Sequence, residues 1–510
     1  MPYSIDKLFI NGRWVDSHGN GGRHGAATAM NNAGTTNEAM LQVLDPATGK
    51  TFATAPSGSR LDAESAVLAA RLAFDEGPWG RTTPRARAAN LLRLAAAIEV
   101  RRERLVDLIV REGGFPIAFA DRVHVQTSID TLRDVAERIL PGFAFQHPLN
   151  PHFGTAMTGT TQATQGVVAR EPIGVASLIV PFNAPFALAV HKLAWALAAG
   201  CTTVVKPSPY TPLQVLLLGE MIDEAGFPPG VVNIVTGGDD VAIELTTHPA
   251  VDIISFTGSD AVGRKVMAQA SGTLKKTVLE LGGKSANIVF ADADLDRAAV
   301  EVIGNMIGNC GQGCLLLTRT LVEDAVHDEL VDKVLALLPS VVIGSPADPS
   351  SMLGPLIRDK ERLRVEHMIR QGEAEGATVA WGGGRPTGLD EGFFLEPTLF
   401  VDVQNTMSVA RKEFFGPVGA IIPFHGEDEA VRFANDSDFG LNSGVFTSDF
   451  GRAFAVARRI RSGNVNINSS FGVNPDAPFG GYKQSGLGRE GGSYGIAEFL
   501  EEKFISWPVG

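Results

Sequence analysis

Residues 173–206 read IGVASLIVPFNAPFALAVHKLAWALAAGCTTVVK, and this stretch decides the fold. Val175–Val180 is a short apolar run typical of a buried strand, residues 186–199 have the length of a buried helix, and Thr202–Lys206 is a second strand-like run. A membrane-spanning helix needs about 20 nearly uninterrupted apolar residues. Prolines, an asparagine and a lysine interrupt this stretch, so we predict a strand, a turn, a helix and a second strand.

The same alternation continues along the chain. Helical patterns at 212–226, 240–247 and 260–271 alternate with apolar runs at Val231–Val235, Ile253–Thr257 and Val278–Leu281. Strands separated by single helices predict a doubly wound parallel sheet, which binds ligands at the carboxyl ends of its strands. A second alternating section, from about 285 to 470, predicts a second α/β domain.

The segment before this sheet has three features of its own. Leu8–Val15 predicts a hairpin with Asn11-Gly12 at the turn. Helical spacing of apolar residues predicts helices over 62–74 and 84–112. Residues 17–40 are rich in Gly, Asn, Ala and Thr, and we expect a flexible insertion there.

Composition excludes several classes of function. The net charge of the 510-residue chain is −13, so it has no basic excess to neutralise nucleic-acid phosphates or to bind an anionic membrane surface. Three cysteines in a chain of this length indicate a reducing compartment without a disulfide framework. The N-terminus has no basic region followed by an apolar core. We therefore expect a cytoplasmic protein with no nucleic-acid or membrane partner.

Two of the cysteines, Cys310 and Cys314, lie in the segment NCGQGCLLL at 309–317. The pair resembles half of a metal clip, but no second half exists in the sequence, and we predict no metal site. Two interpretations of these cysteines remain: a structural cysteine packed in the core, or a nucleophile. Gly311 and Gly313 allow a ligand to approach closely. The apolar run after Cys314 predicts a helix whose N-terminus would lower the thiol pKa.

Two polar residues interrupt apolar surroundings. Glu280 lies in an apolar strand and is followed by two glycines. Desolvation there would raise its pKa toward neutrality, which suits a general acid or base. A structural carboxylate is the alternative. Asn183 lies between Pro181 and Pro185 just after a buried strand, and suits either a preorganised oxyanion donor or an ordinary turn.

Two further features suit phosphate or ribose binding. Phe256–Gly263 is a Gly-containing turn between a strand and a helix, where backbone N–H groups bind phosphates, although a simple helix cap has the same composition. Lys206 ends a strand of the predicted sheet, at the edge where such sheets bind ligands. It is either a ligand-binding residue or a solvated lysine at the end of a strand.

In combination, these residues resemble the NAD(P)-dependent aldehyde dehydrogenase superfamily over nearly the whole chain. The matching motifs are Pro181–Asn183, Lys206–Ser208, Phe256–Ser259, Glu280–Lys284, Gly311–Cys314 and Glu413–Pro417. The resemblance implies two doubly wound α/β domains and a small β bridging element. Residues 1–148 and 173–282 would form the dinucleotide-binding domain and 283–484 the catalytic domain. Residues 149–172 and 485–510 would form the bridging element of a homodimer or homotetramer.

The resemblance also implies roles for individual residues. Cys314 would be the nucleophile, Glu280 the base, and Asn183 would form the oxyanion hole with the backbone N–H of Cys314. Lys192 would lie in the helix under the site, and Glu490 would be an accessory carboxylate. Lys206 and Glu413 would bind the ribose hydroxyls of the cofactor. The implied cofactor-binding set is Val180, Pro181, Phe182, Lys206, Ser208, Phe256, Gly258, Ser259, Leu281, Gly282, Glu413 and Phe415.

The implied reaction is oxidation of an aldehyde to the acid through a thioester on Cys314. CoA-acylating and semialdehyde dehydrogenases are the alternatives. The implied substrate tunnel comprises Ala184, Leu188, His191, Gly313, Leu315, Val473 and Phe479, and its side chains indicate a largely apolar tunnel for a medium-sized or aromatic aldehyde. Where the family usually has Glu three residues after the lysine, this chain has Pro209. NAD remains the expected cofactor, but the missing carboxylate leaves NADP open.

Overall fold

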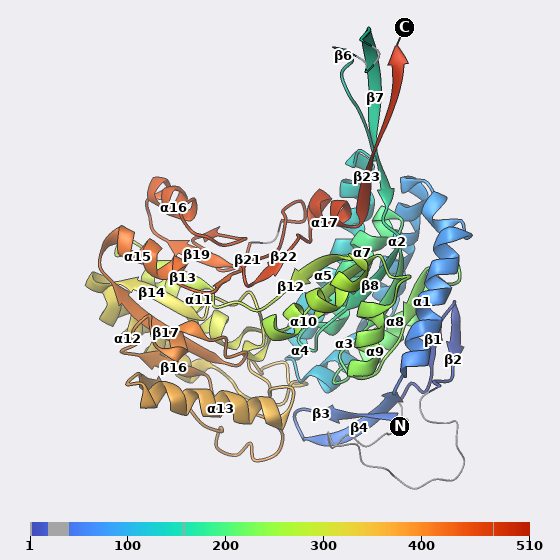
Figure 1. Ribbon diagram of the computed structural model, residues 1–510. Helices are drawn as coiled ribbons and strands as arrows, with labels where there is room; N and C mark the ends of the chain where they lie inside the picture. Colours follow the sequence, from blue (N-terminus) through green and yellow to red (C-terminus); the bar gives the residue numbers. More distant parts are fainter. Residues whose placement is uncertain (1–2, 19–39, 156, 158, 473, 510) are drawn as a thin grey trace.

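The computed structural model of the chain describes residues 3–18, 40–155, 157, 159–472 and 474–509. It contains two α/β bodies and a long β arm that projects from one of them (Figure 1). Nearly all of the flexible insertion predicted at 17–40, and the predicted tunnel residue Val473, lie outside the described residues.

The first body is built on an eight-stranded sheet. Its order is β2 (Arg13–Val15), β1 (Leu8–Ile10), β10 (Val232–Ile234), β9 (Thr202–Lys206), β8 (Val175–Ile179), β11 (Ile253–Thr257), β12 (Lys276–Glu280) and β22 (Gly486–Leu487). The five strands from β10 to β12 are parallel, as predicted. Because β8 has β9 on one side and β11 on the other, the strand order reverses there, and such a reversal opens a crevice at the carboxyl ends.

Alternate side chains of these strands enter two separate cores. Val175 and Ile179 of β8 pack on the side of α1 (Arg60–Asp75), α9 (Asp239–Thr247) and α10 (Asp260–Ala270), whereas Ala176 and Leu178 pack on the side of α7 (Pro185–Ala199) and α8 (Leu213–Glu224). This two-residue period is that of a strand buried on both faces. The strands and helices predicted between 175 and 281 are confirmed, with ends shifted by at most two residues.

The N-terminal elements agree with prediction in part. β1 and β2 form the predicted hairpin, with φ of 54° at Asn11 and 68° at Gly12, and a second hairpin joins β3 (Met40–Asp45) to β4 (Lys50–Pro56). The single helix predicted over 84–112 is wrong. It is divided at Arg101, where φ is −104° and ψ is 13°, into α2 (Pro84–Val100) and α3 (Arg102–Gly113). Both halves pack against α8, and the break lets each keep that contact.

A helical segment that the sequence did not predict follows α3. It comprises α4 (Ile117–Phe119), the π-helical η2 (Ala120–Gln126), α5 (Thr127–Asp134), the π-helical η3 (Val135–Ile139) and α6 (Leu140–Gly142). α5 packs against α7. π-helical turns are rare and often occur at functional sites. The first of these two, η2, brings residues 124–127 to α7, the helix that follows Asn183.

The second body confirms the predicted second α/β section. Its sheet has the order β15 (Thr378–Trp381), β16 (Thr398–Val401), β17 (Val418–Phe424), β14 (Arg319–Glu323), β13 (Ala286–Val289), β19 (Ser443–Phe446) and β20 (Asn466–Ile467), and all neighbours except β15 and β16 are parallel. Its α-helices are α11 (Leu295–Ile307), α12 (His327–Leu337), α13 (Asp359–Ala374), α14 (Ser408–Arg411), α15 (Gly426–Asn435) and α16 (Phe450–Ala457). It also contains three short 3-10 helices, η5 (Gly308–Gly311), η6 (Asp324–Val326) and η7 (Leu338–Ser340), and the strand pair β18 (Phe439–Gly440) and β21 (Tyr482–Lys483).

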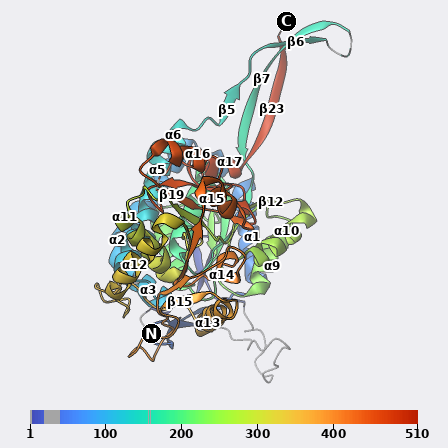
Figure 2. The same cartoon turned by 90° about the vertical axis from the view of Figure 1, so that its left-hand side faces the viewer.

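The arm is a separate sheet of β5 (Gln146–Pro148), β6 (His152–Thr155), β7 (Thr161–Pro172) and β23 (Leu500–Val509). β23 pairs with β7 along its whole length, and the pair extends well beyond both bodies (Figures 1 and 2). Large apolar side chains on β23 stay exposed, including Phe504 at 61% and Trp507 at 46%. Of the predicted segment 485–510, the arm takes in β23 alone, because β22 joins the first sheet and α17 (Gly492–Glu498) packs on α7.

Candidate active site

Cys314 lies in a turn of the loop between α11 and β14 rather than at the start of a helix. The helix predicted after Cys314 is wrong, because side chains from elsewhere bind the loop backbone. Leu317 donates its N–H to Asn305 Oδ1 at 2.8 Å, and Asn442 Nδ2 donates to the carbonyl oxygen of Leu315 at 2.8 Å. These bonds replace the hydrogen bonds that a helix would have formed within itself.

The backbone just before Cys314 is left-handed at three consecutive residues. The φ angles are 50° at Asn309, 58° at Cys310 and 72° at Gly311. A Cβ atom on Gly311 would lie 2.2 Å from the carbonyl carbon of Gly416, so that position requires glycine. Cys310 is fully buried and its thiol lies 3.6 Å from the carbonyl oxygen of Gly114, which makes it a packed cysteine. Left-handed residues other than glycine are costly and persist where other contacts hold them.

Buried hydrogen bonds supply those contacts and join the loop to Asn183. Asn309 Nδ2 donates to the carbonyl oxygens of Asn183 at 2.7 Å and Gln312 at 3.1 Å, while Asn183 Nδ2 donates to the Gln312 carbonyl oxygen at 2.8 Å. On the other side, His124 Nε2 lies 3.2 Å from Asn309 Oδ1, and Ile357 N donates to Gln312 Oε1 at 3.1 Å. The turn after β8 and the Cys314 loop therefore form one rigid unit.

The Cys314 side chain is partly exposed, and two carboxyl groups lie near it. Desolvation raises the pKa of the thiol to about 12, and the negative charges of Glu413 and Glu280 act in the same direction. The expectation that a helix N-terminus lowers this pKa is therefore wrong for the protein without cofactor, since the helix itself is absent. A Cβ atom on Gly283, three residues after Glu280, would lie 2.5 Å from the carbonyl oxygen of Cys314, so the chain at the candidate nucleophile runs beside the segment that follows Glu280.

Glu280 ends β12 and is buried, as predicted. Desolvation raises the pKa of its carboxyl group well above the usual value, and the charge of Glu490 raises it further. Neither carboxyl oxygen has a hydrogen-bond partner among the described residues. A Cβ atom on Gly480 would lie 2.7 Å from Glu280 Oε1, so the glycine leaves room for the carboxyl group. A buried carboxyl group of this kind suits proton transfer.

A buried ion pair lies behind Glu280. Lys192 Nζ donates to Glu490 Oε1 at 2.6 Å and to Ser255 Oγ at 2.8 Å, and Ser255 Oγ lies 3.2 Å from the same carboxylate oxygen. Glu490 is held in turn by backbone pairing with Phe479. The structure thus brings the predicted residues Lys192 and Glu490 together. It adds Ser255 of β11, which the sequence analysis missed.

A second group of predicted residues lies at the carboxyl ends of β8, β9 and β11. Lys206 is buried, its pKa is lowered to about 8 by desolvation, and its Nζ donates to the Pro207 carbonyl oxygen at 3.1 Å. Ser259 caps α10 through its Oγ, and Ser208 Oγ accepts from Tyr210 N at 3.2 Å. Phe256 lies in β11, and Val180, Pro181, Phe182 and Gly258 lie in the turns that follow β8 and β11, so these residues belong to the same edge of the sheet.

A third group comes from the second body. Glu413 Oε1 accepts from Gly283 N at 2.9 Å, burial raises the pKa of this carboxyl group to about 7, and a Cβ atom on Gly282 would lie 2.2 Å from its other oxygen. The Phe415 ring meets Phe182 edge-to-face, with centroids 5.7 Å apart. Leu281 packs on Gly263. Residues of both bodies therefore meet at this crevice.

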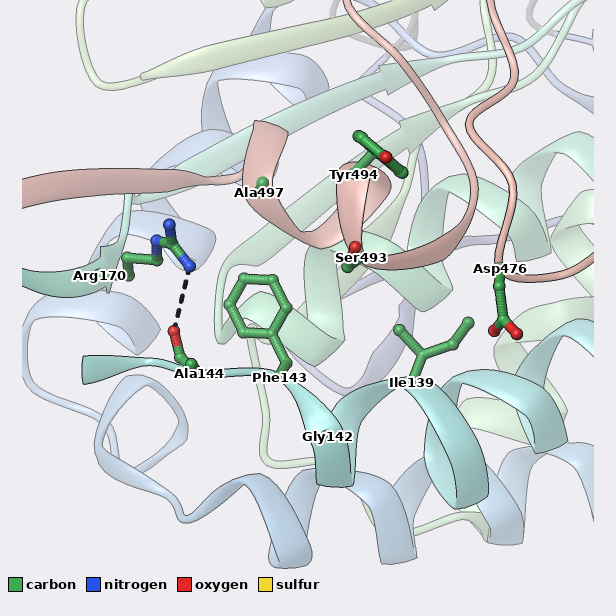
Figure 3. Close-up of a pocket in the computed structure, with 9 residues that line it drawn as sticks. All are labelled: Ile139, Gly142, Phe143, Ala144, Arg170, Asp476, Ser493, Tyr494 and Ala497. Atoms are coloured by element: carbon green, nitrogen blue, oxygen red, sulfur yellow. Dashed lines mark hydrogen bonds between the residues drawn. The ribbon is translucent and has the colours of Figure 1, made fainter. Parts of the chain in front are cut away.

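The predicted tunnel residues share one property. Ala184, Leu188, His191, Gly313, Leu315 and Phe479 are each partly accessible, whereas the other residues of α7 are buried. A separate cavity of about 450 Å³ borders Arg170 of the arm, and Arg170 Nη1 donates to the Ala144 carbonyl oxygen at 3.2 Å there (Figure 3). None of the candidate catalytic residues lines that cavity.

Two kinds of feature are absent from the residues that the structure describes. No three His, Cys, Asp or Glu side chains are grouped as metal ligands within the described part of the chain. Over those same ranges, no helix has the length and apolar character that a bilayer crossing requires.

The chain belongs to the aldehyde dehydrogenase family, whose family model matches residues 33–505. Among curated proteins, it is 38% identical to a putative aldehyde dehydrogenase of Staphylococcus saprophyticus, over 99% of both chains. It is 36% identical to the putative aldehyde dehydrogenase DhaS of Bacillus subtilis, over 98% of this chain and 95% of that one.

Solved structures of related proteins contain NAD⁺. An aldehyde dehydrogenase of Mycobacterium tuberculosis complexed with NAD⁺ is 39% identical, with a TM-score of 0.89 and 98% of each chain covered. Aldehyde dehydrogenase C of Pseudomonas syringae was solved as a cysteine-to-alanine mutant complexed with NAD⁺ and octanal, and it is 37% identical to this chain. The match has a TM-score of 0.90 and covers 99% of this chain and 97% of that one. Betaine aldehyde dehydrogenase of Staphylococcus aureus with NAD⁺ is 32% identical, with a TM-score of 0.90 and 98% and 94% covered.

Proposed function

We propose that this protein oxidises an aldehyde to the carboxylic acid with NAD⁺, using Cys314 as nucleophile and Glu280 as base. One observation carries the proposal: a partly exposed thiol and a buried carboxyl group without a hydrogen-bond partner lie within electrostatic reach of each other. The NAD⁺ complexes of the related structures support the choice of cofactor.

The chemistry follows from these two groups. The Cys314 thiolate attacks the aldehyde carbon and forms a C–S bond, and the carbonyl oxygen takes the negative charge. A hydride then leaves that carbon with two electrons, so a thioester remains. Glu280 takes a proton from water, the resulting hydroxide attacks the thioester, the C–S bond breaks, and the acid leaves. Lys192 and Glu490 would position Glu280 electrostatically from behind.

The oxyanion is assigned to Asn183 and the backbone N–H of Cys314. Asn183 Nδ2 carries two hydrogens, and one of them is engaged by the Gln312 carbonyl oxygen. The second is available to a substrate oxygen, and the bonds from Asn309 hold the group in place. A donor fixed before the reaction stabilises developing charge most effectively.

The crevice residues fit a dinucleotide. Lys206 Nζ has three hydrogens and one bond among the described residues, so donors are free for ribose hydroxyl groups. Glu413 is a buried acceptor on the opposite body, and Phe182 and Phe415 offer apolar ring surface. When bound, NAD⁺ supplies the hydride acceptor. We propose that the first body, with 1–148 and 173–282, holds the dinucleotide and that 283–484 supplies the thiol. Pro209 leaves no carboxylate to repel the 2′-phosphate of NADP.

The finer assignments follow the same reasoning. The accessible tunnel residues are mostly apolar, which favours a medium-sized or aromatic aldehyde. A CoA-acylating reaction would not need Glu280 to activate water, and the described residues place no arginine among the tunnel set to bind a semialdehyde's carboxylate. The exposed apolar strand β23 suits a homodimer or homotetramer interface. Free cysteines suit a reducing cytoplasm.

The test compares wild type with Cys314→Ala. With octanal or benzaldehyde as substrate, the wild-type protein should reduce NAD⁺, and it should reduce NADP⁺ more slowly. The product should be the free acid even when CoA is present. Cys314→Ala should lose the activity by a factor of about 10³ or more, because the covalent step is removed. Cys201→Ala is the matched control, since that thiol is buried against Phe499. Undiminished NADH formation by Cys314→Ala would refute the proposal, and acyl-CoA as product would establish the alternative reaction.

A further inference from the structure

His124 is a fully buried histidine in the π-helical turn η2, and the proposed reaction does not use it. Its ring stacks on Phe115, with ring centroids 4.7 Å apart, and meets Phe119 edge-on. Its Nε2 atom lies 3.2 Å from Oδ1 of Asn309, the residue that binds the backbone of Asn183. Because π-helical turns are rare and often mark functional sites, a polar ring that such a turn brings to Asn309 suggests a role in the site.

The hydrogen bonds of Asn309 show which ring nitrogen of His124 carries the hydrogen. Asn309 Nδ2 lies 2.7 Å from the Asn183 carbonyl oxygen and 3.1 Å from that of Gln312, and carbonyl oxygens only accept hydrogen bonds. Both hydrogens of the amide group are therefore used there, and Oδ1 remains as an acceptor. His124 Nε2 must donate to it, because a ring nitrogen without a hydrogen would face this oxygen with a second lone pair.

The other ring nitrogen of His124 has no such contact. Nδ1 is buried and has no hydrogen-bond partner among the described residues. A buried polar atom without a partner is destabilising, and a phenylalanine ring would stack on Phe115 without that cost. Burial also lowers the pKa of the ring to about 4, so His124 is neutral at neutral pH and Nδ1 holds no hydrogen. Packing alone therefore does not account for a histidine here, and the Nε2–H donor is the property that distinguishes it.

Asn309 transmits this hydrogen bond to the proposed oxyanion hole. Its φ angle is 50°, a left-handed conformation that persists only where other contacts hold it. Its amide group binds the carbonyl oxygens of Asn183 and Gln312, and the Gln312 oxygen also accepts from Asn183 Nδ2 at 2.8 Å. If the Asn309 carboxamide rotated by half a turn, its oxygen would face two carbonyl oxygens and its amide group would face the His124 N–H. The His124 donor therefore favours one orientation of this carboxamide.

We propose that His124 is a positioning residue, which acts through Asn309 to hold the Asn183 side chain where it binds the substrate oxyanion. A donor that is oriented before the reaction stabilises the charge that develops in the transition state. A loosened donor therefore slows that step more than it weakens binding. This inference rests on the proposed function, in which Asn183 is the oxyanion donor, and adds a fully buried residue that acts from behind it.

The test is the rate constant of the NADH burst in the first turnover with NAD⁺ and octanal, which reports the covalent and hydride steps. His124→Phe keeps a ring but has no donor. It should lower this rate by about tenfold or more, whereas the Kd for NAD⁺, measured without aldehyde, should change by less than about twofold. His124→Gln, whose amide nitrogen can take the position of Nε2, should restore most of the rate. Phe119→Leu removes a ring contact of His124 but no hydrogen bond, and should leave the rate within about twofold of wild type.

A double-mutant cycle shows whether His124 acts through Asn183. Asn183→Ala should itself lower the burst rate by a factor of about 10², and adding His124→Phe should then lower it by less than about twofold more. A wild-type rate in His124→Phe, a rate in His124→Gln as slow as in His124→Phe, or a loss as large in Asn183→Ala as in wild type would overturn the inference. An undiminished rate in Asn183→Ala alone would instead contradict the proposed function.

Thermal unfolding of each variant separates a positioning role from a structural one. His124→Met is a second donor-free variant, with a flexible side chain that can fill the same space, and it takes the place of His124→Phe if that variant does not fold. If neither donor-free variant folds, the role of His124 is structural and the inference is overturned.

Discussion

The thiol of Cys314 is the residue on which the proposed chemistry depends, and its surroundings keep it protonated. Burial and two nearby carboxyl groups raise its pKa to about 12. Because the thiolate is the reactive form, the free protein should hold a protected thiol at neutral pH. The positive charge of a nicotinamide ring beside the sulfur would favour the thiolate, which couples activation to cofactor binding.

Alkylation of Cys314 by iodoacetamide tests this account. Below the thiol pKa the thiolate fraction rises about tenfold per pH unit, so the rate without cofactor should be low at neutral pH and rise steeply with pH. Saturating NAD⁺ should increase the rate at any one pH. Peptide mass spectrometry would locate the label, and Cys201 and Cys310, both fully buried, are internal controls that should stay unlabelled. A fast rate that does not change with pH would show that the thiol is already ionised.

At the scale of elements, one buried carboxyl group links three helices around the site. Glu112 of α3 accepts hydrogen bonds from Leu213 N at 2.7 Å, Gln214 N at 3.1 Å and Gln214 Nε2 at 2.9 Å, and so caps α8. Gln214 Oε1 in turn accepts from Phe186 N at 3.3 Å in the first turn of α7. The start of α7, next to Asn183, therefore depends on α3.

Glu112→Leu should destabilise the protein by about 2 kcal/mol or more, because it leaves buried N–H donors without an acceptor. Burial raises the pKa of Glu112 from 4.5 to about 7 in the folded protein. Because the pKa of Glu112 is higher in the folded protein than in the unfolded chain, the stability that its protonated form gives to the wild type is lost as the pH rises toward 7. The destabilisation caused by Glu112→Leu should therefore be largest near pH 5 and smaller near pH 8. Thermal unfolding at several pH values measures this. The exposed Glu103→Ala, also in α3, should change little, and a larger effect at high pH would contradict the assignment.

The sequence predicted elements well where one local signal decided them. β9 and β11 are recovered residue for residue, because a short apolar run between helices in a doubly wound sheet has few other structures open to it. The helix expected after Cys314 is absent, since Asn305 and Asn442 bind that backbone instead. Such bonds join residues far apart in the chain, and no local pattern reveals them.

The same distinction holds for the site. Glu280 stood out as a carboxylate in an apolar strand, and its raised pKa agrees with that expectation. Asn309 and His124 were missed, because their importance comes from hydrogen bonds formed by tertiary folding. Asn309 Nδ2 donates to the Asn183 carbonyl oxygen, and Asn309 Oδ1 lies beside His124 Nε2, 185 positions away in the sequence. The thiol pKa was predicted in the wrong direction, because it depends first on burial of the thiol and then on the charges of Glu413 and Glu280, and all three arise only through tertiary folding.

At the scale of the whole molecule, the site exists where the two bodies meet. Glu280 ends a strand of the first sheet, Cys314 precedes a strand of the second, and Glu490 lies between β22 of the first sheet and α17. Neither body holds both the proposed nucleophile and the proposed base. The central claim is accordingly that Cys314 forms the thioester and that Glu280 hydrolyses it.

The most direct measurement is a rapid-mixing experiment on Glu280→Gln with NAD⁺ and octanal, followed by intact-protein and peptide mass spectrometry. The proposed mechanism predicts a fast burst of about one NADH per chain and an octanoyl adduct on Cys314. Steady turnover should then be slower than wild type by a factor of about 10² or more. Wild-type turnover in Glu280→Gln, or no adduct on Cys314, would contradict the central claim.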